Sequence, residues 1–200
     1  RGGLAPERLG CGPHVPFDKR TAFELARAGR RPERIHNNCS GKHAGFLLLA
    51  QSLGQPLDQY LDPSGDAQRR VRAAVAEMAG LEVGAGDVAT DGCGAPTLRM
   101  PLSSLAQAFC RLMNPSGLGP VREAACLRIR TAIRNAPVHF AGEGRLGTLL
   151  AISAPGRVVA KNGAEGVYAV GGLVRRGAFG IAIKVRDGAE RGYAGAIVAL

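Results

Sequence analysis

Residues 179–186 read Phe-Gly-Ile-Ala-Ile-Lys-Val-Arg, and this stretch decides the fold class. Every second residue is apolar, which is the period of a β-strand that buries one face. The apolar set is Phe179, Ile181, Ile183 and Val185. The pattern therefore predicts a half-buried strand near the end of the 200-residue chain.

Two shorter runs before this strand are also predicted as strands, at residues 157–161 and 166–170. Asn162 and Gly163 between them are a turn-forming pair, which joins the two runs. After Asp187 the spacing of apolar residues becomes helical. The apolar positions of this last helix are Tyr193, Ile197 and Leu200.

The residues before Gly156 show helical spacing instead. One predicted helix ends near Gly80, one follows Ser103 and Ser104, and one covers about residues 120–134. Their apolar positions are, in chain order, Val71, Val75 and Met78, then Leu105, Phe109 and Leu112, then Cys126, Ile129 and Ile133. Cys126 is therefore predicted to be a buried apolar residue.

Two further helices are predicted nearer the start of the chain. Thr21 followed by Glu24 fits a capping box, and Gly29 with Pro32 stops that helix. Ser40 is predicted to cap the second helix. Its apolar face is Phe46, Ala50 and Leu53.

Helices that precede a group of antiparallel strands indicate an α+β architecture. We therefore expect an antiparallel sheet with flanking helices. The sequence shows no internal repeat and no low-complexity linker, so we expect residues 1–200 to form a single domain.

The net charge of +10 would suit a nucleic-acid partner, but the pattern of charge argues against one. Only four of the 26 basic residues are Lys, and the Arg residues are scattered singly and in pairs. Aromatic residues make up 4% of the chain and Trp is absent, so no stacking platform is present. We expect an Arg-rich solvated surface and no nucleic-acid partner.

No apolar run approaches the roughly 18 residues that a membrane span needs, so we expect no membrane partner. Five cysteines are an odd count, which disfavours a disulfide framework and predicts reduced thiols in the cytoplasm. The chain begins at Arg1, which leads us to expect that an upstream segment is missing.

A first candidate for chemistry is His-Asn-Asn-Cys-Ser-Gly-Lys-His-Ala-Gly at residues 36–45. Cys39 and Lys42 fall across the predicted start of a helix, where the helix dipole stabilises a thiolate and disfavours an ammonium group. Lys42 and His43 are thus placed where a cation is least welcome, which indicates a functional site. The alternative is an ordinary helix start whose Lys points into water.

A second candidate is Asp-Gly-Cys-Gly-Ala-Pro-Thr at residues 91–97. Two glycines and a proline predict a tight turn that presents Cys93. Cys39 and Cys93 could then bind a metal as two soft ligands, with Lys42 or His43 as a third, although their separation matches no compact zinc-finger spacing. The alternative is a plain turn with an incidental thiol.

A third candidate is Lys161-Asn162-Gly163, at the end of a predicted strand. It resembles the Lys-Thr-Gly element that serine β-lactamases and penicillin-binding proteins carry on a strand beside their active site. The alternative is a lysine beside a hairpin turn.

These segments together resemble one family. The order of residues 36–45, 91–97 and 160–167 is similar to that in the Rhizobium-etli-type L-asparaginases, or asparaginase II family, and Cys-Gly-Pro-His-Val-Pro at 11–16 resembles another stretch of it. The resemblance covers essentially the whole chain. It implies a fold like that of serine β-lactamases and hydrolysis of L-asparagine to L-aspartate and ammonia.

The resemblance also implies roles for individual residues. Cys39, Lys42 and Cys93 would bind zinc, as a cofactor that is not strictly catalytic. His43 and Asp91 would line the substrate pocket, with Asp91 holding the α-ammonium group of asparagine. Lys161 would be the catalytic lysine that activates a serine nucleophile.

The chain departs from the family pattern in three places. It contains no Ser-x-x-Lys, the element that carries the family's nucleophile, so we expect an N-terminally truncated domain. Asn162 replaces the usual Gly, which alters a turn. Gly147 replaces the usual Asp, which removes a carboxylate and is expected to loosen a local interaction.

Three functions stay open on this basis. The first is an asparaginase with L-asparagine as its small-molecule substrate, either monomeric or a homodimer. The second is an inactive truncated homologue that acts as a zinc-binding or interaction module. The third is a cysteine hydrolase with Cys39 as nucleophile and Lys42 or His43 as base.

Overall fold

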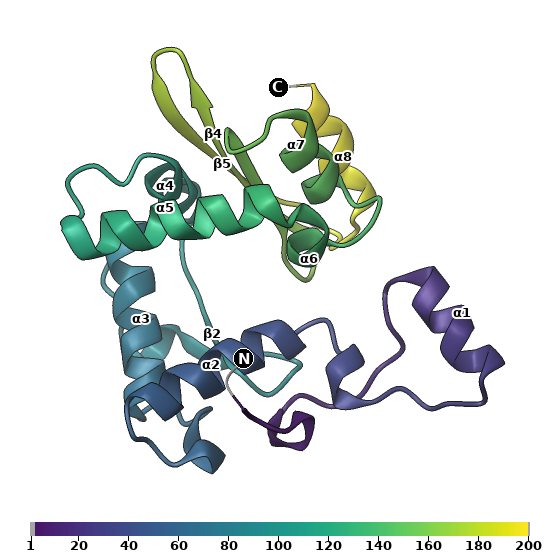
Figure 1. The fold of residues 1–200 in the computed structure, drawn as a ribbon. Helices are drawn as coiled ribbons and strands as arrows, with labels where there is room; N and C mark the ends of the chain where they lie inside the picture. The colour runs from purple at the N-terminus through teal and green to yellow at the C-terminus, as the bar shows by residue number, and fades with distance from the viewer. Residues whose placement is uncertain (1–2, 200) are drawn as a thin grey trace. The chain divides into compact units, whose positions relative to one another are not determined.

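The structure, a computed structural model, describes residues 3–199 (Figure 1). It is an α+β fold with two small antiparallel sheets and flanking helices, as predicted. The chain divides into two compact units, residues 1–74 with 82–99 and residues 75–81 with 100–200. The single domain expected from the sequence stays a prediction.

The larger sheet lies in the second unit. It consists of β3 (Val158–Asn162), β4 (Val167–Val174) and β5 (Gly177–Lys184), antiparallel in the order β3-β4-β5. All three predicted strands are present, although β4 is longer than expected. The predicted Asn162-Gly163 connection is confirmed, since β3 ends at Asn162 and the amide of Gly163 donates to the carbonyl of Val167 at 2.8 Å.

The apolar face of β5 packs as its alternation predicts. It joins a cluster of buried residues that includes Tyr193 and Ile197 of α8 (Arg191–Val198). Tyr193 and Ile197 confirm two of the three positions expected for the last helix, and Leu200 lies outside the described residues. This cluster fixes α8 against one face of the sheet.

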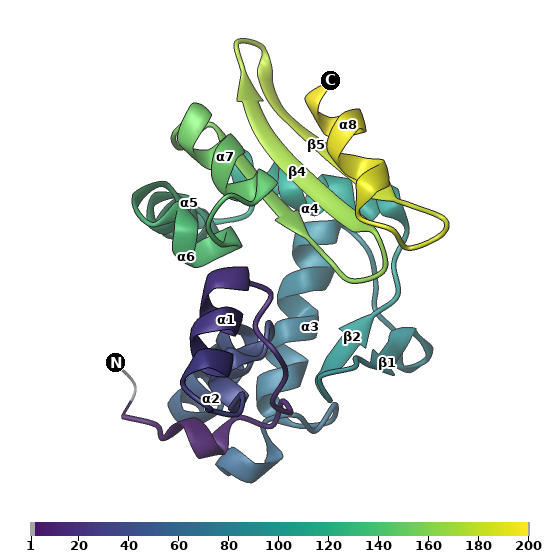
Figure 2. The ribbon, with the colours of Figure 1, turned by 90° about the vertical axis from the view of Figure 1, so that its right-hand side faces the viewer.

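The other face of the sheet is also covered, so the expectation of a half-buried strand is wrong. Helix α4 (Leu102–Met113) packs there against glycines, and Figure 2 shows α4 and α8 on opposite sides of β4 and β5. A Cβ atom at Gly180 would lie 1.8 Å from the carbonyl oxygen of Ala106, and one at Gly171 would lie 2.4 Å from that of Phe109. The glycines let the helix backbone approach the strands closely.

Helices α5 (Pro120–Asn135), α6 (Pro137–Ala141) and α7 (Leu146–Ser153) complete the second unit. In α5, Cys126 is buried as predicted, but Ile129 is 49% exposed. Ile129 is three residues from Cys126, which places it about 60° round the helix and outside the narrow buried stripe.

The first unit contains α1 (Lys19–Arg27), α2 (Ser40–Ser52) and the strands β1 (Val88–Thr90) and β2 (Pro96–Leu98). Helix α3 (Asp66–Ala79) continues from this unit into the second, and it ends beside Gly80 as predicted. Within the described residues, short 3₁₀ turns occur at Pro6–Arg8, Arg34–His36, Leu57–Gln59 and Ala85–Asp87. The β1–β2 pair was not predicted, because three residues are too few to show alternation.

Three predicted helix starts differ from the structure in register. Asp18, not Thr21, is the N-cap of α1, and its carboxylate accepts a hydrogen bond from the Thr21 amide at 2.7 Å. Cys39, not Ser40, is the N-cap of α2, and α4 begins at Leu102, before the predicted Ser103. The N-cap of α1 is a short polar side chain, as expected, but it is Asp18, three positions before the predicted Thr21.

All five cysteines are free thiols, as predicted. Within residues 3–199, no helix is both long and apolar enough to cross a membrane.

Candidate metal centre

Two segments of the first unit build the candidate site. One is the start of α2, where Cys39 is the N-cap and Lys42 lies in the first turn. The other is the turn between β1 and β2, which is closed by a hydrogen bond from the Asp91 amide to the Ala95 carbonyl at 2.8 Å. Gly94 has φ +84 there, a conformation that favours glycine, so the predicted tight turn is confirmed.

The turn brings Asp91 and Cys93 to the start of α2. The Sγ atoms of Cys39 and Cys93 and a carboxylate oxygen of Asp91 all lie within 4.8 Å of one another. The Cys93 thiol also donates to Asp91 Oδ2 at 3.5 Å. Two sulfur donors and one oxygen donor suit zinc, so the residues present fit such an ion.

Lys42 belongs to the same cluster through an ion pair. Its Nζ donates to Asp91 Oδ2 at 2.9 Å, and both side chains are about one-third exposed. The hydrogen bond from Lys42 lowers the pKa of Asp91 below its usual value. Burial acts to lower the pKa of Lys42, but the hydrogen bond to Asp91 and the neighbouring thiols together raise it. Lys42 as a zinc ligand, which requires the neutral amine, stays a prediction.

The thiol of Cys39 differs from the sequence-based expectation. The helix start was expected to favour the thiolate, but burial raises the pKa of Cys39, even though the charge of Lys42 acts to lower it. The Cys39 thiol also forms no hydrogen bond that caps α2. Burial therefore outweighs the charge of Lys42, and the net shift of the pKa disfavours the Cys39 thiolate.

His43 is fully buried beside the cluster and not part of it. Its Nδ1 lies 2.5 Å from the hydroxyl oxygen of Tyr60, which itself accepts a hydrogen bond from the Gly10 amide at 2.6 Å. Burial, followed by the charge of Lys42, lowers the pKa of His43, so the ring is neutral at pH 7. Its role as a substrate-binding residue stays a prediction, and Tyr60, which orients it, shows no signal in the sequence.

A layer of polar contacts holds the N-terminal segment against the start of α2. Asn37 donates through Nδ2 to the Gly12 carbonyl at 2.6 Å, and its Oδ1 accepts from the Cys39 amide at 2.8 Å. Arg34 donates to the carbonyls of Leu9 and Cys11 at 2.7 and 3.2 Å. These contacts explain physically why the segment at residues 11–16 occurs together with the segment at residues 36–45: hydrogen bonds join the two. Asn37 and Arg34, which make these bonds, are functional candidates that could not be recognised from the sequence.

Lys161 lies in the second unit, on β3 opposite Ala169. Its Nζ donates to the backbone carbonyl of Asn162 at 3.0 Å and to Asn162 Oδ1 at 2.9 Å. Because Lys161 and the cysteines are in different units, its assignment as the catalytic lysine stays a prediction.

Gly147 is buried in α7 and closely packed, and the loosening expected from the missing carboxylate stays a prediction. A Cβ atom there would lie 2.6 Å from the carbonyl oxygen of Ala160. The absence of a side chain is therefore what lets α7 approach β3.

This geometry defines the class of protein: an α+β fold that carries two thiols and a carboxylate at the start of a helix. The sequence matches the L-asparaginase II family over residues 1–200, so the chain belongs to that family. No curated protein matches it. The resemblance to the asparaginase II family is thus confirmed, and membership of that family supports an asparaginase-type function. The likeness to the Rhizobium-etli-type enzymes in particular and the N-terminal truncation stay predictions.

Proposed function

We propose that the chain hydrolyses the side-chain amide of L-asparagine to L-aspartate and ammonia, and that its dithiol cluster binds zinc. The observation that supports this most is the convergence of Cys39, Asp91 and Cys93, from segments about fifty residues apart, in a member of the L-asparaginase II family. Cys39 and Cys93 would hold the ion, with Lys42 or Asp91 as a further donor.

A zinc ion at this place would supply positive charge that attracts and polarises oxygen atoms of a substrate. The chain's own residues would do the rest. Asp91 is an anionic group at the site, and it fits an α-ammonium group that takes the place of the Lys42 ammonium. His43 is held in one orientation by Tyr60 and has its Nε2 without a partner among the described residues.

The proposed chemical step uses Lys161 and the hydroxyl of a serine nucleophile, which the family resemblance implies and which no Ser-x-x-Lys element in residues 1–200 supplies. The serine would lose its proton to the neutral amine of Lys161 while its oxygen bonds to the side-chain carbonyl carbon of asparagine. The carbon–nitrogen bond would then break as the nitrogen takes up a proton and leaves as ammonia. Water would hydrolyse the resulting ester to L-aspartate and restore the serine.

A second candidate function is a metal-binding homologue without turnover. It is favoured by the cluster of Cys39, Asp91 and Cys93, which offers metal donors whether or not the chain hydrolyses L-asparagine. Ammonia release from L-asparagine distinguishes the two functions. Release above that of a buffer blank supports the asparaginase, and zinc binding without release supports the second candidate.

Zinc content tests the metal site separately. We expect the purified wild-type chain to contain about one zinc per chain and the Cys93→Ser variant to lose most of it. Cys110→Ser is a matched control, because Cys110 is a partly buried free thiol of α4 in the other unit. Equal zinc content in the wild type and Cys93→Ser would refute the site.

A further inference from the structure

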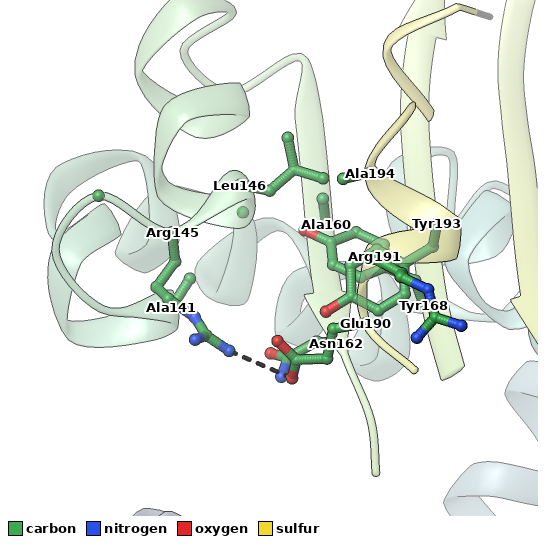
Figure 3. A pocket seen from close by; sticks show the side chains of 12 residues that line it. Ala141, Arg145, Leu146, Ala160, Asn162, Tyr168, Glu190, Arg191, Tyr193 and Ala194 are labelled. Atoms are coloured by element: carbon green, nitrogen blue, oxygen red, sulfur yellow. Dashed lines mark ion pairs between the residues drawn. The ribbon is translucent and has the colours of Figure 1, made fainter. Parts of the chain in front are cut away.

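The second unit contains a pocket of about 310 Å³ beside β3, between the first turns of α7 and α8 (Figure 3). This volume is in the range of small-ligand sites, about 300–1,000 Å³. The pocket is lined by Ala160 and Asn162, which alternate along β3 with Lys161. The side chain of Lys161 therefore starts from the opposite face of β3. The pocket is thus not the place where Lys161 is proposed to act on asparagine.

Both helices begin at the pocket without capping. The N-cap residues are Arg145 for α7 and Glu190 for α8, and neither side chain makes a capping hydrogen bond. Neither first turn contains an acidic residue. Glu190 already supplies a carboxylate at the start of α8, so it is the backbone amides and the positive dipole end of α7 that favour an anionic ligand group in the pocket.

Tyr168 supplies an independent sign of a ligand. Its side chain is only 3% exposed and lines the pocket, yet its hydroxyl has no hydrogen-bond partner among residues 3–199. The hydroxyl oxygen would lie 3.5 Å from a Cβ atom at Gly147, so it is directed at the first turn of α7. Burial, with a smaller contribution from Tyr193, raises the pKa of Tyr168 to about 12, so the hydroxyl stays a donor at pH 7.

The charged groups at the pocket are balanced, and the pair of Arg145 and Glu190 is loosely joined, with the Tyr193 hydroxyl as a further neighbour of Glu190. Arg145 and Glu190 face one another at 3.5 Å, the contact drawn as a dashed line in Figure 3. Charge-assisted hydrogen bonds between such groups are normally about 2.7–2.9 Å long. Arg191 is instead paired with Asp187 at 2.5 Å. A ligand that carries both charges can separate Arg145 from Glu190 and satisfy each of them.

We propose that this pocket binds a small zwitterionic α-amino acid. Its carboxylate would lie against the first turn of α7, Tyr168 and Arg145, and its ammonium group would pair with Glu190. A volume of about 310 Å³ accommodates an amino acid of the size of aspartate or asparagine. The site is built within one unit and does not depend on the dithiol cluster.

Tyrosine fluorescence reports on this pocket directly. The chain has no Trp and three Tyr, of which Tyr168 and Tyr193 line the pocket. We use L-aspartate as the probe because it has no side-chain amide to hydrolyse, and succinate as the probe that lacks the ammonium group. Titration of the full chain, with calorimetry as a second readout, should show saturable binding of L-aspartate that is at least about tenfold tighter than that of succinate.

Variants assign each contact. Arg145→Ala and Tyr168→Phe should weaken L-aspartate binding about tenfold, the equivalent of one lost hydrogen bond to a charged group. Glu190→Gln should weaken L-aspartate binding but leave succinate unchanged. Arg175→Ala, in the exposed turn after β4, is the control and should bind as the wild type does. Circular dichroism confirms that each variant is folded.

The proposal is overturned by any of three results. These are no saturable binding of L-aspartate at millimolar concentration, equal affinity for succinate and L-aspartate, or unchanged affinity in folded Tyr168→Phe and Arg145→Ala proteins. Cys93→Ser separates this test from that of the proposed function. Binding that survives in Cys93→Ser supports the pocket, whereas binding that this variant alone abolishes belongs to the dithiol site and refutes the pocket.

Discussion

Removing one hydroxyl group at Tyr60 should destabilise the first unit by several kcal/mol. Tyr60 is 3% exposed, and its oxygen accepts from the Gly10 amide at 2.6 Å and lies 2.5 Å from His43 Nδ1. Because the oxygen already accepts from Gly10, its own proton is available to donate to the neutral His43. Tyr60→Phe leaves Nδ1 of the buried His43 without a partner, and it removes the hydrogen-bond partner of the amide of Gly10, which is an exposed residue.

The expected loss follows from these two contacts. The unpaired buried His43 costs about 1–3 kcal/mol and the lost hydrogen bond from the exposed Gly10 about 0.5–1.5 kcal/mol, so the free energy of unfolding should fall by about 1.5–4.5 kcal/mol. Tyr168→Phe is a matched control, since Tyr168 is equally buried but its hydroxyl has no partner among the described residues. Its effect should stay within about 0.5 kcal/mol.

Urea unfolding followed by circular dichroism measures both variants, and alkylation of the fully buried Cys11 reports on the first unit. We expect the midpoint of Tyr60→Phe to fall with an unchanged m-value, and Cys11 to become reactive at lower urea. Equal stability of Tyr60→Phe and Tyr168→Phe would refute the reasoning.

Two further predictions concern the second unit. Gly180→Ala should destabilise it by about 2 kcal/mol or more in urea unfolding, because the added Cβ would meet the backbone of Ala106. Gly45→Ala is the control, because Gly45 of α2 has open space around it, and this variant should stabilise the protein by about 0.5–1 kcal/mol. The same change in stability for both variants would contradict the close packing at Gly180. The hydrogen bond from Arg122 lowers the pKa of Glu77 in the folded protein. The pair therefore stabilises the fold fully at pH values above the pKa of Glu77 in the unfolded chain, about 4.3. This stabilisation is lost as the pH falls through the lower pKa of Glu77 in the folded protein. Glu77→Gln should therefore be less stable than the wild type by up to about 1 kcal/mol at pH 7, a difference that disappears in acid, and a difference independent of pH would refute the assignment.

Much of the local structure could be predicted from the sequence because local patterns encode it. The alternation from Phe179 to Val185 identified β5 and its apolar face, and the glycines around Cys93 identified a tight turn. The register of helix starts was predicted less well. Asp18 and Thr21 offer the same capping chemistry, and only the hydrogen bond in the folded chain selects Asp18.

The site was predicted in part, for a similar reason. The sequence identified Cys39 and Cys93, since both occur in segments with unusual composition. It assigned Asp91 to the substrate, which stays a prediction, and it did not foresee that the Asp91 carboxylate lies within 4.8 Å of both thiols and pairs with Lys42. Tyr60 occurs in no recognisable pattern, because its function depends only on what lies next to it.

The sequence by itself determined the α+β class, the three strands of the larger sheet, the cysteine segments and the family, because periodicity and short segments are properties of neighbouring residues. The tertiary structure decided which side chains meet. Asp91 lies close to Cys39 only because of the path that the roughly fifty residues between them take in the folded chain. The second face of the sheet is covered only because α4 packs on Gly171 and Gly180. Such contacts depend on the path of the whole chain, which no local pattern records.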